Sequence, residues 1–196
     1  MTKQKAGNRK SENIQSFRKS APTKTNSKMK TRLIIPSWFL TLATALAADS
    51  IPNRLIDYQE FQKIVVASAP EREAHRLTEA QFLAAMPDKQ AVLLDARTAS
   101  KFDLRHIRGA VSLPFTDFTA ETLAQIIPTK GTKILIYCNN NFLGSRISFA
   151  SKAPSASLNI STYTSLKSYG YTNIFELGPL LDVKTTAIPF DGTETH

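Results

Sequence analysis

The sequence predicts an α/β fold, a parallel sheet with helices on both faces. Ala91–Leu94 and Lys133–Tyr137 are short, mostly apolar runs with the length of strands that are buried on both sides. Helix signals follow each run, and strands that alternate with helices indicate a parallel sheet. The 196 residues leave room for one ordinary domain.

Local signals place the other elements around these two strands. Thr78 and Gln81 form a capping box, in which the hydroxyl and the amide satisfy free backbone N–H groups, and Pro87 ends the helix that runs to Met86. The remaining predictions are a helix around Tyr58–Ser68, a helix over Ser100–Arg105, a strand over Ala110–Leu113, a helix capped by Thr119 and closed by Pro128, a helix over Thr162–Tyr169 capped by Ser161 and ended by Gly170, and a strand over Asn173–Glu176.

The basic charge of the chain is confined to its N-terminal part. The formal net charge is +9, and the segment Met1–Arg32 alone holds ten Lys or Arg residues against the single acid Glu12. From Leu33 onward, fifteen basic residues balance fifteen acidic ones. A nucleic-acid-binding surface would carry its charge on the folded domain, so this distribution predicts no nucleic-acid partner.

A signal peptide explains the N-terminus best. Leu33–Ala48 is a run of sixteen residues without a charge, shorter than the roughly 20 residues of a membrane span. It contains Ala45-Leu46-Ala47, the small-x-small motif that signal peptidase accepts. We therefore predict a signal peptide over residues 29–47, export to the bacterial periplasm and no stable membrane span after cleavage. The alternative is that the apolar segment is not cleaved and anchors the protein in the membrane. Residues 1–28, which precede the predicted signal peptide, are either a disordered basic extension or the result of a start codon assigned too early.

Cys138 is the single cysteine of the chain, and it follows the second predicted strand directly. An exported protein with one thiol cannot form an intramolecular disulfide. The thiol is therefore buried, paired with another molecule, or retained for its chemistry. A buried core cysteine at a strand end is the structural alternative to a nucleophile.

Four segments, in this order, resemble the rhodanese-like domain family. They are the strand and turn Leu93–Arg97, the stretch His106–Pro114, the strand and cysteine Ile134–Cys138, and the closing helix, turn and strand Leu166–Leu177. The resemblance implies a rhodanese-like domain over residues 76–185. A leader at residues 48–75 would precede it, and a C-terminal tail at residues 186–196 would follow.

The resemblance also implies a sulfurtransferase. A rhodanese attacks the outer sulfur of a donor such as thiosulfate with a cysteine thiolate, holds that sulfur as a persulfide and passes it to a nucleophile; Cys138 would be this cysteine. A strand end that faces a helix N-terminus favours the thiolate. The implied partners are a small sulfur-donor anion or a protein thiol, and no cofactor is implied. No metal site is expected, since His106 has no second ligand at a suitable spacing.

The loop after Cys138 departs from the family pattern. The family has four residues between Cys and Arg, whereas here Gly144 and Arg146 keep the Gly-x-Arg relation three residues later. The family's terminal Gly-Gly and Trp are also missing. We expect the sulfur at the mouth of a concavity, ringed by backbone N–H groups. The residues expected to bind the substrate are Arg146, Asn139, Asn140, Asn141 and Gly144.

Three further residues of the family-like segments have a predicted structural role. We expect Asp95, Arg97 and His106 to hold the loops together by hydrogen bonds. The longer loop also keeps a second function open: a non-catalytic rhodanese-fold module that binds a partner protein or an anion.

Overall fold

A computed structural model describes residues 51–194. The predicted signal peptide and basic extension lie outside these described residues. Among the helices of residues 51–194, none is both long and apolar enough to cross a membrane.

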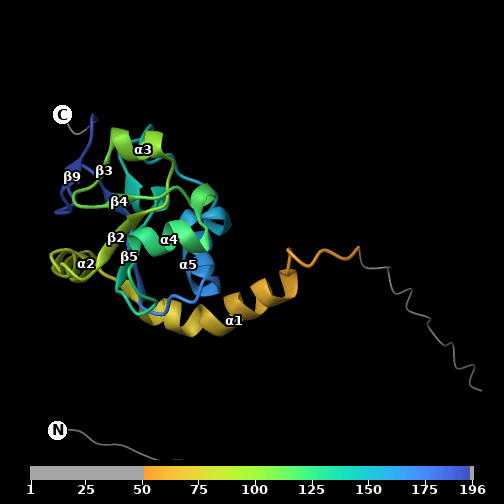
Figure 1. The fold of residues 1–196 in the computed structure, drawn as a ribbon. Helices are drawn as coiled ribbons and strands as arrows, with labels where there is room; N and C mark the ends of the chain where they lie inside the picture. Colours follow the sequence, from red (N-terminus) through yellow and green to blue (C-terminus); the bar gives the residue numbers. More distant parts are fainter. Residues whose placement is uncertain (1–50, 195–196) are drawn as a thin grey trace, which may run out of the picture. The chain divides into compact units, whose positions relative to one another are not determined.

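A parallel five-stranded sheet forms the centre of the fold, as predicted (Figure 1). Its strand order is β1 (Arg76–Leu77), β7 (Ile174–Leu177), β5 (Ile134–Tyr137), β2 (Val92–Asp95) and β4 (Val111–Ser112). Strand β5 is therefore central, paired with β2 on one side and β7 on the other. The chain runs from β2 to β4 at one edge and then returns to β5, so the strand order reverses at β2. Crevices at the carboxyl ends of such strands are the usual ligand sites of open α/β sheets.

The two faces of the sheet have separate cores because side chains alternate along each strand. Ile134 and Ile136 of β5 pack with the helices on one face, whereas Leu135 and Tyr137 pack on the other. Figure 1 shows α4 and α5 on the first side of the sheet and α2 on the second. The helices are α1 (Tyr58–Ala74), α2 (Glu79–Ala85), α3 (Ala99–Leu104), α4 (Ala120–Ile126) and α5 (Leu158–Ser168).

Two helices begin at the capping boxes of threonines. Thr78 accepts the N–H of Gln81, whose side chain accepts the N–H of Thr78, as predicted. Thr119 and Thr122 form the same reciprocal pair at the start of α4. Each cap satisfies two backbone donors that the first turn leaves free, which fixes where the helix starts.

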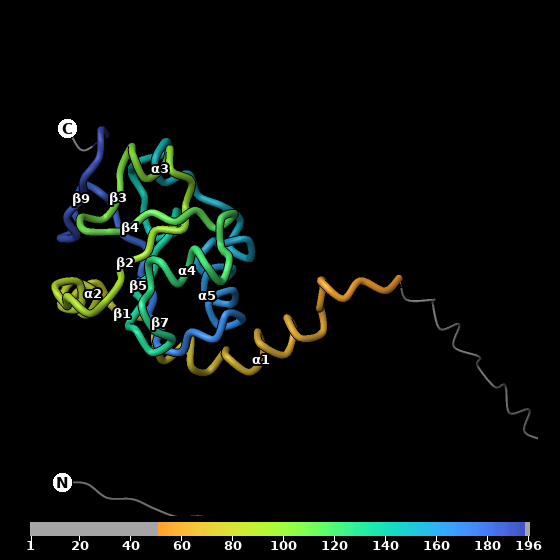
Figure 2. The backbone as a smooth tube through the Cα atoms, in the orientation of Figure 1, coloured from red at the N-terminus to blue at the C-terminus, as the bar shows by residue number. Residues whose placement is uncertain are grey.

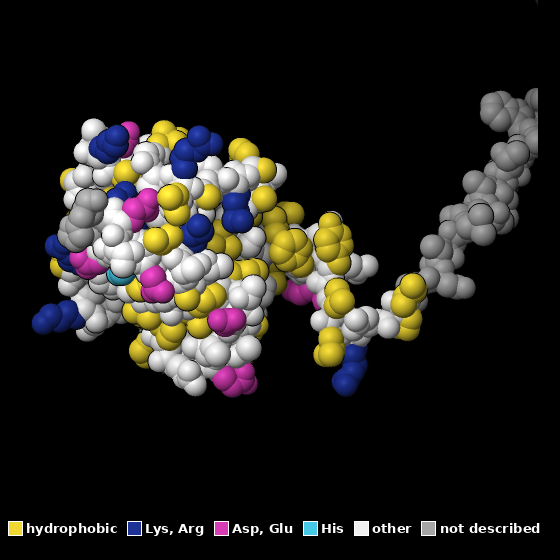
Figure 3. Space-filling view, turned by 90° about the horizontal axis from the view of Figure 1, so that it is seen from above, with side chains coloured by type: hydrophobic (Ala, Val, Ile, Leu, Met, Phe, Trp, Pro, Cys, Tyr) yellow, Lys and Arg dark blue, Asp and Glu magenta, His cyan; other side chains and the backbone are white. Residues whose placement is uncertain are grey.

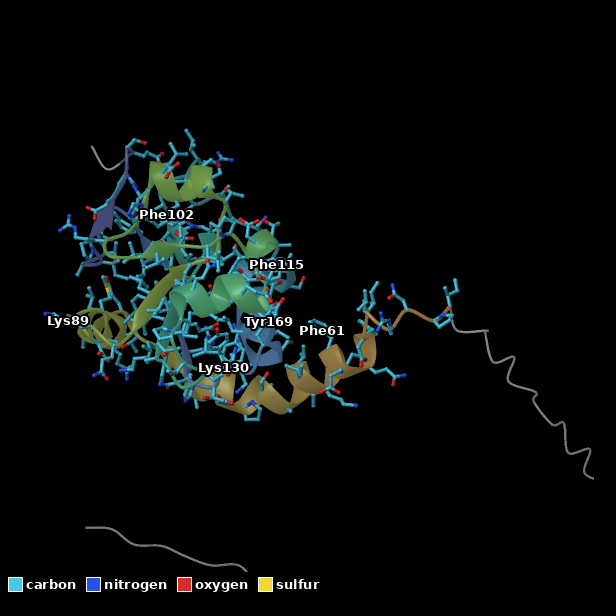
Figure 4. All side chains as sticks on the ribbon, viewed as in Figure 1. Phe61, Lys89, Phe102, Phe115, Lys130 and Tyr169 are labelled. Atoms are coloured by element: carbon cyan, nitrogen blue, oxygen red, sulfur yellow. The ribbon has the colours of Figure 1, made fainter. Side chains whose placement is uncertain are left out.

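Helix α1 occupies most of the predicted leader and extends six residues beyond its predicted end at Ser68. Its C-terminal part contacts the domain, and Lys167 of α5 lies 2.8 Å from Glu71. Its N-terminal part carries exposed apolar side chains, among them Phe61, which Figure 4 labels. Figure 3 shows apolar side chains exposed along this helix. The leader thus contributes a helix that packs on α5.

Helix α5 begins four residues before the predicted Thr162, at Leu158 with Ser157 as its N-cap. A 3-10 turn over Pro154–Ala156 leads directly into it. The added first turn is held by Asn159, whose buried amide donates to Asn141 at 3.1 Å. The prediction of a later start was wrong because tertiary contacts, rather than local propensity, set this end of the helix.

The C-terminal segment predicted as a tail packs on the domain in the described part. Strand β9 (Phe190–Asp191) pairs antiparallel with β3 (His106–Ile107), and the two strands run side by side in Figure 2. Ile188 is buried in the core. Gly192 has φ +120°, and a Cβ there would lie 2.5 Å from the Leu104 carbonyl oxygen. This close approach requires glycine.

Candidate functional site

Cys138 follows the last residue of the central strand, at the carboxyl edge of the sheet. Its carbonyl oxygen accepts the N–H of Asn141, one 3-10 turn further along the chain, at 3.1 Å. Its sulfur lies 3.4 Å from the Ser157 hydroxyl oxygen, at the N-cap of α5. The residue is only 1 % exposed. The structure therefore places the sulfur beside a side-chain hydroxyl group at a helix N-terminus.

The same residue lines a pocket of about 230 Å³ on the β7 side of β5. The polar side chains of the lining include Arg72, Arg76, Glu176, Ser157 and Asn159. Two guanidinium groups thus share the pocket with the thiol and one carboxylate. A small anion that enters here finds cations and hydroxyl or amide groups around Cys138.

Asn141 clamps the start of the loop to its surroundings. Its Oδ1 accepts the N–H of Cys138 at 2.8 Å, and its Nδ2 donates to the Leu177 carbonyl at 2.6 Å. Asn139 donates to the Ala150 carbonyl at 2.7 Å, outside this clamp. The amides hold backbone in place, so these side chains act first as supports of the loop.

Asn140 ties the rim of the loop to its far end. It accepts the N–H of Lys152 at 3.0 Å and donates to the carbonyl of the same residue at 2.9 Å. Both contacts are to backbone groups, as is the contact of Asn139. Asn140 and Asn141 line the Cys138 pocket, whereas Asn139 lines a separate pocket.

The chain leaves the site after Asn141. Phe142 is fully buried and begins β6 (Phe142–Leu143), which pairs parallel with β8 (Leu181–Asp182). Gly144 has φ +89°, and a Cβ there would lie 2.8 Å from a carboxylate oxygen of Asp182. The expected ring of N–H groups from 139 to 144 therefore does not surround the sulfur, because a strand replaces the compact loop.

Arg146 and Gly144 are not brought to Cys138. Both line a different pocket, next to Phe142 and Ser151. The Arg146 side chain is exposed, and within residues 51–194 it makes no ion pair. The two residues whose spacing matched the family's Gly-x-Arg lie elsewhere because the inserted residues lead the chain away through β6.

Asp95 and Arg97 form a buried ion pair at the end of β2. Arg97 Nε lies 2.9 Å from Asp95 Oδ1, and Nη2 lies 2.5 Å from Oδ2. The guanidinium also donates to the carbonyls of Ser148 and Arg105, at 2.9 and 2.8 Å. Burial opposes the charged form of Arg97, but hydrogen bonds and charge from Asp95 outweigh it and raise the pKa. The pair joins β2 to the long loop and to the end of α3.

Tyr137 extends this network into the central strand. Its hydroxyl donates to Asp95 Oδ2 at 2.5 Å and accepts the N–H of Ile107 at 3.0 Å. Burial and the Asp95 charge raise the pKa of Tyr137 well above its ordinary value, so the phenol stays protonated. The network fixes the residue immediately before Cys138.

His106 serves the packing of α3. Its Nδ1 lies 2.7 Å from the Phe102 carbonyl oxygen, and its ring stacks on Phe102, labelled in Figure 4, with centroids 3.7 Å apart. Among the described residues, no three His, Cys, Asp or Glu side chains gather into a group that could hold a metal ion.

The pocket residues that come from outside the loop were not predicted from the sequence. Arg72 and Arg76 come from α1 and β1, and Glu176 from β7. The two arginines lie beyond the predicted end of the first helix at Ser68, so no local signal placed them at the site. The pairing of β1 with β7 brings Arg76 next to Glu176, but the two residues of β1 are too few to give a strand pattern in the sequence.

The family model of the rhodanese-like domain matches residues 78–177. The chain belongs to the rhodanese-like domain family. This match confirms the resemblance and the fold predicted from the sequence. No curated protein matches the chain at a significant level.

Solved structures similar to this rhodanese-like chain include three bacterial proteins. Alr3790 from Anabaena sp. is 18 % identical with a TM-score of 0.42, over 59 % of this chain and 91 % of that one. BH2092 from Bacillus halodurans is 14 % identical with a TM-score of 0.43, over 68 % and 88 %. A rhodanese with anions from E. coli is 18 % identical with a TM-score of 0.34, over 53 % and 99 %.

Arg72 and Arg76 both precede the segment that matches the rhodanese-like family model. The match begins at Thr78, within the cap of α2. The cations of the Cys138 pocket are therefore contributed from outside the matched domain.

Proposed function

We propose that this protein is a sulfurtransferase that carries sulfane sulfur on Cys138 as a persulfide. The observation that carries the proposal is the position of Cys138 at the carboxyl end of the central strand, on the wall of a pocket and beside the N-cap of α5. A helix N-terminus favours anions, and a thiolate is the nucleophilic form of cysteine. Family membership supports the same chemistry.

The transfer has two balanced steps. The Cys138 thiolate attacks the outer sulfur of thiosulfate, a new S–S bond forms, and sulfite leaves with the electron pair of the old bond. An acceptor nucleophile then attacks the outer sulfur of the persulfide, and the thiolate is regenerated. No net oxidant is needed, since the sulfur changes carriers only.

The Ser157 hydroxyl next to the sulfur supports this chemistry. Its oxygen lies 3.4 Å from Cys138 Sγ, at the N-cap of α5, and can donate a hydrogen bond to a thiolate. Charge-assisted hydrogen bonds of this kind are stronger than neutral ones, so they stabilise a thiolate or a persulfide anion more than a thiol. Tyr137 and the clamp of Asn141 hold the cysteine backbone in position.

Sulfur loading of the purified protein tests the proposal. Incubation with thiosulfate should add the mass of one sulfur atom at Cys138, and cyanide should remove it. Cys138→Ser should abolish the gain, because a serine hydroxyl cannot form a persulfide. If the wild type takes up no sulfur from thiosulfate or from other sulfane-sulfur donors, the proposal fails and a binding module becomes the better explanation.

We also propose that the protein works after export, with a signal peptide removed behind Ala47. This rests on the charge-free segment Leu33–Ala48 and on Ala45-Leu46-Ala47. Mass spectrometry of the protein from its native host should find an N-terminus at Ala48. Recovery of the intact segment in a membrane fraction would show an anchor instead.

A further inference from the structure

The Cys138 pocket is cationic on the side of α1 and β1. Arg72 lies in the last turn of α1, and Arg76 begins β1. The pairing of β1 with β7 places Arg76 directly opposite Glu176. The last turn of α1 brings Arg72 to the same carboxylate from the helix that precedes β1.

One buried carboxylate holds both guanidinium groups. Arg72 Nη2 lies 2.7 and 2.8 Å from the two oxygens of Glu176, and Arg76 Nε lies 3.1 Å from one of them. The Glu176 side chain is 3 % exposed, whereas those of Arg72 and Arg76 are 29 % and 39 % exposed. The buried Glu176 carboxylate therefore holds the two guanidinium groups in place, and both arginine side chains remain partly exposed to solvent.

The charges in this lining do not cancel. Two guanidinium groups face one carboxylate there. Arg76 has a second acid partner in Glu73 at 3.3 Å, but that carboxylate is 70 % exposed, and solvent screens such pairs strongly. The pocket beside the thiol keeps an excess of positive charge.

Two buried polar atoms in the lining lack a hydrogen-bond partner among the described residues. They are Arg72 Nε and Asn159 Oδ1. The orientation of Asn159 follows from its donation to Asn141 Oδ1, since Asn141 itself donates to Leu177. The residue Asn159 is 5 % exposed. Buried polar groups are normally paired, so these two atoms leave hydrogen-bonding capacity in residues of the lining.

We propose that Arg72 and Arg76 form the anion-binding half of the Cys138 site, a role that the sequence pattern assigned to Arg146. The ligand class is a small, hydrated oxyanion that carries a terminal sulfane sulfur. The identity of this ligand rests on the proposed sulfur transfer, whereas the cationic site itself does not. Glu176 is a positioning residue for the two arginines.

Alkylation of the thiol measures this site without any sulfur transfer. Iodoacetate is an anion and iodoacetamide is a neutral reagent of nearly the same size. In both cases the thiolate forms a C–S bond and iodide leaves. Because Cys138 is the single cysteine, all alkylation reports on one sulfur. The quantity compared is the iodoacetate rate divided by the iodoacetamide rate. A change in the thiolate fraction or in access to the sulfur alters both rates equally and cancels in this ratio. The ratio therefore measures how strongly the pocket attracts an anion.

The expected result is a fall in this ratio when an arginine is removed. Arg76→Gln keeps the bidentate Arg72 contact, so it is the principal variant, and it should lower the ratio about threefold to tenfold. Arg76→Lys keeps the charge and should keep most of the ratio. Arg146→Gln removes an exposed charge that lines another pocket and should leave the ratio unchanged. Arg72→Gln should act like Arg76→Gln wherever circular dichroism shows that it folds.

The outcomes separate this proposal from the sulfurtransferase proposal. A lower ratio in Arg76→Gln, with no sulfur uptake by the wild type, would support the anion site and refute sulfur transfer. Sulfur uptake with an unchanged ratio in Arg76→Gln, or a lower ratio in Arg146→Gln instead, would overturn the anion site. If neither reagent alkylates the folded wild type but both alkylate it in urea, the pocket does not admit ligands and both proposals fail.

Discussion

The Tyr137 hydroxyl lies 2.5 Å from Oδ2 of Asp95, the carboxylate that also binds Arg97. Each of the three side chains is almost completely buried. The last residue of β5 before Cys138 is thereby tied to the end of β2 and, through Arg97, to the Ser148 carbonyl in the long loop. The geometry of the thiol depends on a buried charge network that does not touch it.

Removal of the Asp95 charge should be more destabilising than removal of the Tyr137 hydroxyl. Asp95→Asn leaves a buried guanidinium without its counter-ion and should cost about 3–5 kcal/mol of unfolding free energy. Tyr137→Phe leaves the N–H of Ile107 without its acceptor and should cost about 1–3 kcal/mol. Urea unfolding measures both. The exposed pair Arg108–Asp191 is the control, and Asp191→Asn should cost at most about 1 kcal/mol.

The two neighbouring asparagines of the loop should differ in effect. Asn141→Ala leaves three buried groups short of a partner, the N–H of Cys138, the carbonyl of Leu177 and the amide of Asn159, and also the part-buried carbonyl of Pro179. We expect a loss of about 2–4 kcal/mol and a changed alkylation rate at Cys138. Asn140→Ala removes contacts with the backbone of Lys152 at the exposed rim, so the loss should be smaller. Equal losses in urea unfolding would contradict the clamp.

The pH dependence of stability tests the environment of Glu176. Burial raises its pKa, against the opposing charge and hydrogen bonds of Arg72. A carboxyl with a raised folded-state pKa takes up its proton in the folded state first, so acidification favours the folded state until the pH falls below the unfolded pKa of about 4.3.

The comparison is wild type against Glu176→Gln, which does not titrate. The unfolding free energy of the wild type, minus that of the variant, should increase as the pH is lowered from about 7 to about 4. Urea unfolding at a series of pH values gives this difference. A decrease instead would mean that the arginines lower the pKa more than burial raises it.

Much of the fold could be predicted from the sequence because its signals are local. The apolar runs of β2 and β5 and the caps at Thr78 and Thr119 lie within a few residues of the elements they define. The strands β1, β3, β6, β8 and β9 were missed, since each has two residues and exists only through its pairing partner.

The candidate site could be predicted at Cys138, where a strand ends, and at Asn140 and Asn141, which line the same pocket. Arg146 was assigned to the site by its spacing from Gly144, but β6 carries both residues away from the thiol. Arg76 comes to the pocket through its register with Glu176, a contact between residues far apart in the chain. Such long-range pairings carry no signal in a single sequence.

The C-terminal strand should depend on Gly192 more than other turns depend on their glycines. Gly170 has φ +84°, and a Cβ added there would meet no atom within 4 Å. The cost of Gly170→Ala is therefore only that of placing alanine in the left-handed backbone conformation, about 1–2 kcal/mol of unfolding free energy. Gly192→Ala adds a Cβ that would lie 2.5 Å from the Leu104 carbonyl oxygen, so the backbone of the strand must move. We expect a larger loss of unfolding free energy for Gly192→Ala. Hydrogen exchange should also quicken in β9 and at its β3 partner Ile107, and equal losses with unchanged exchange would show that the segment does not stabilise the domain.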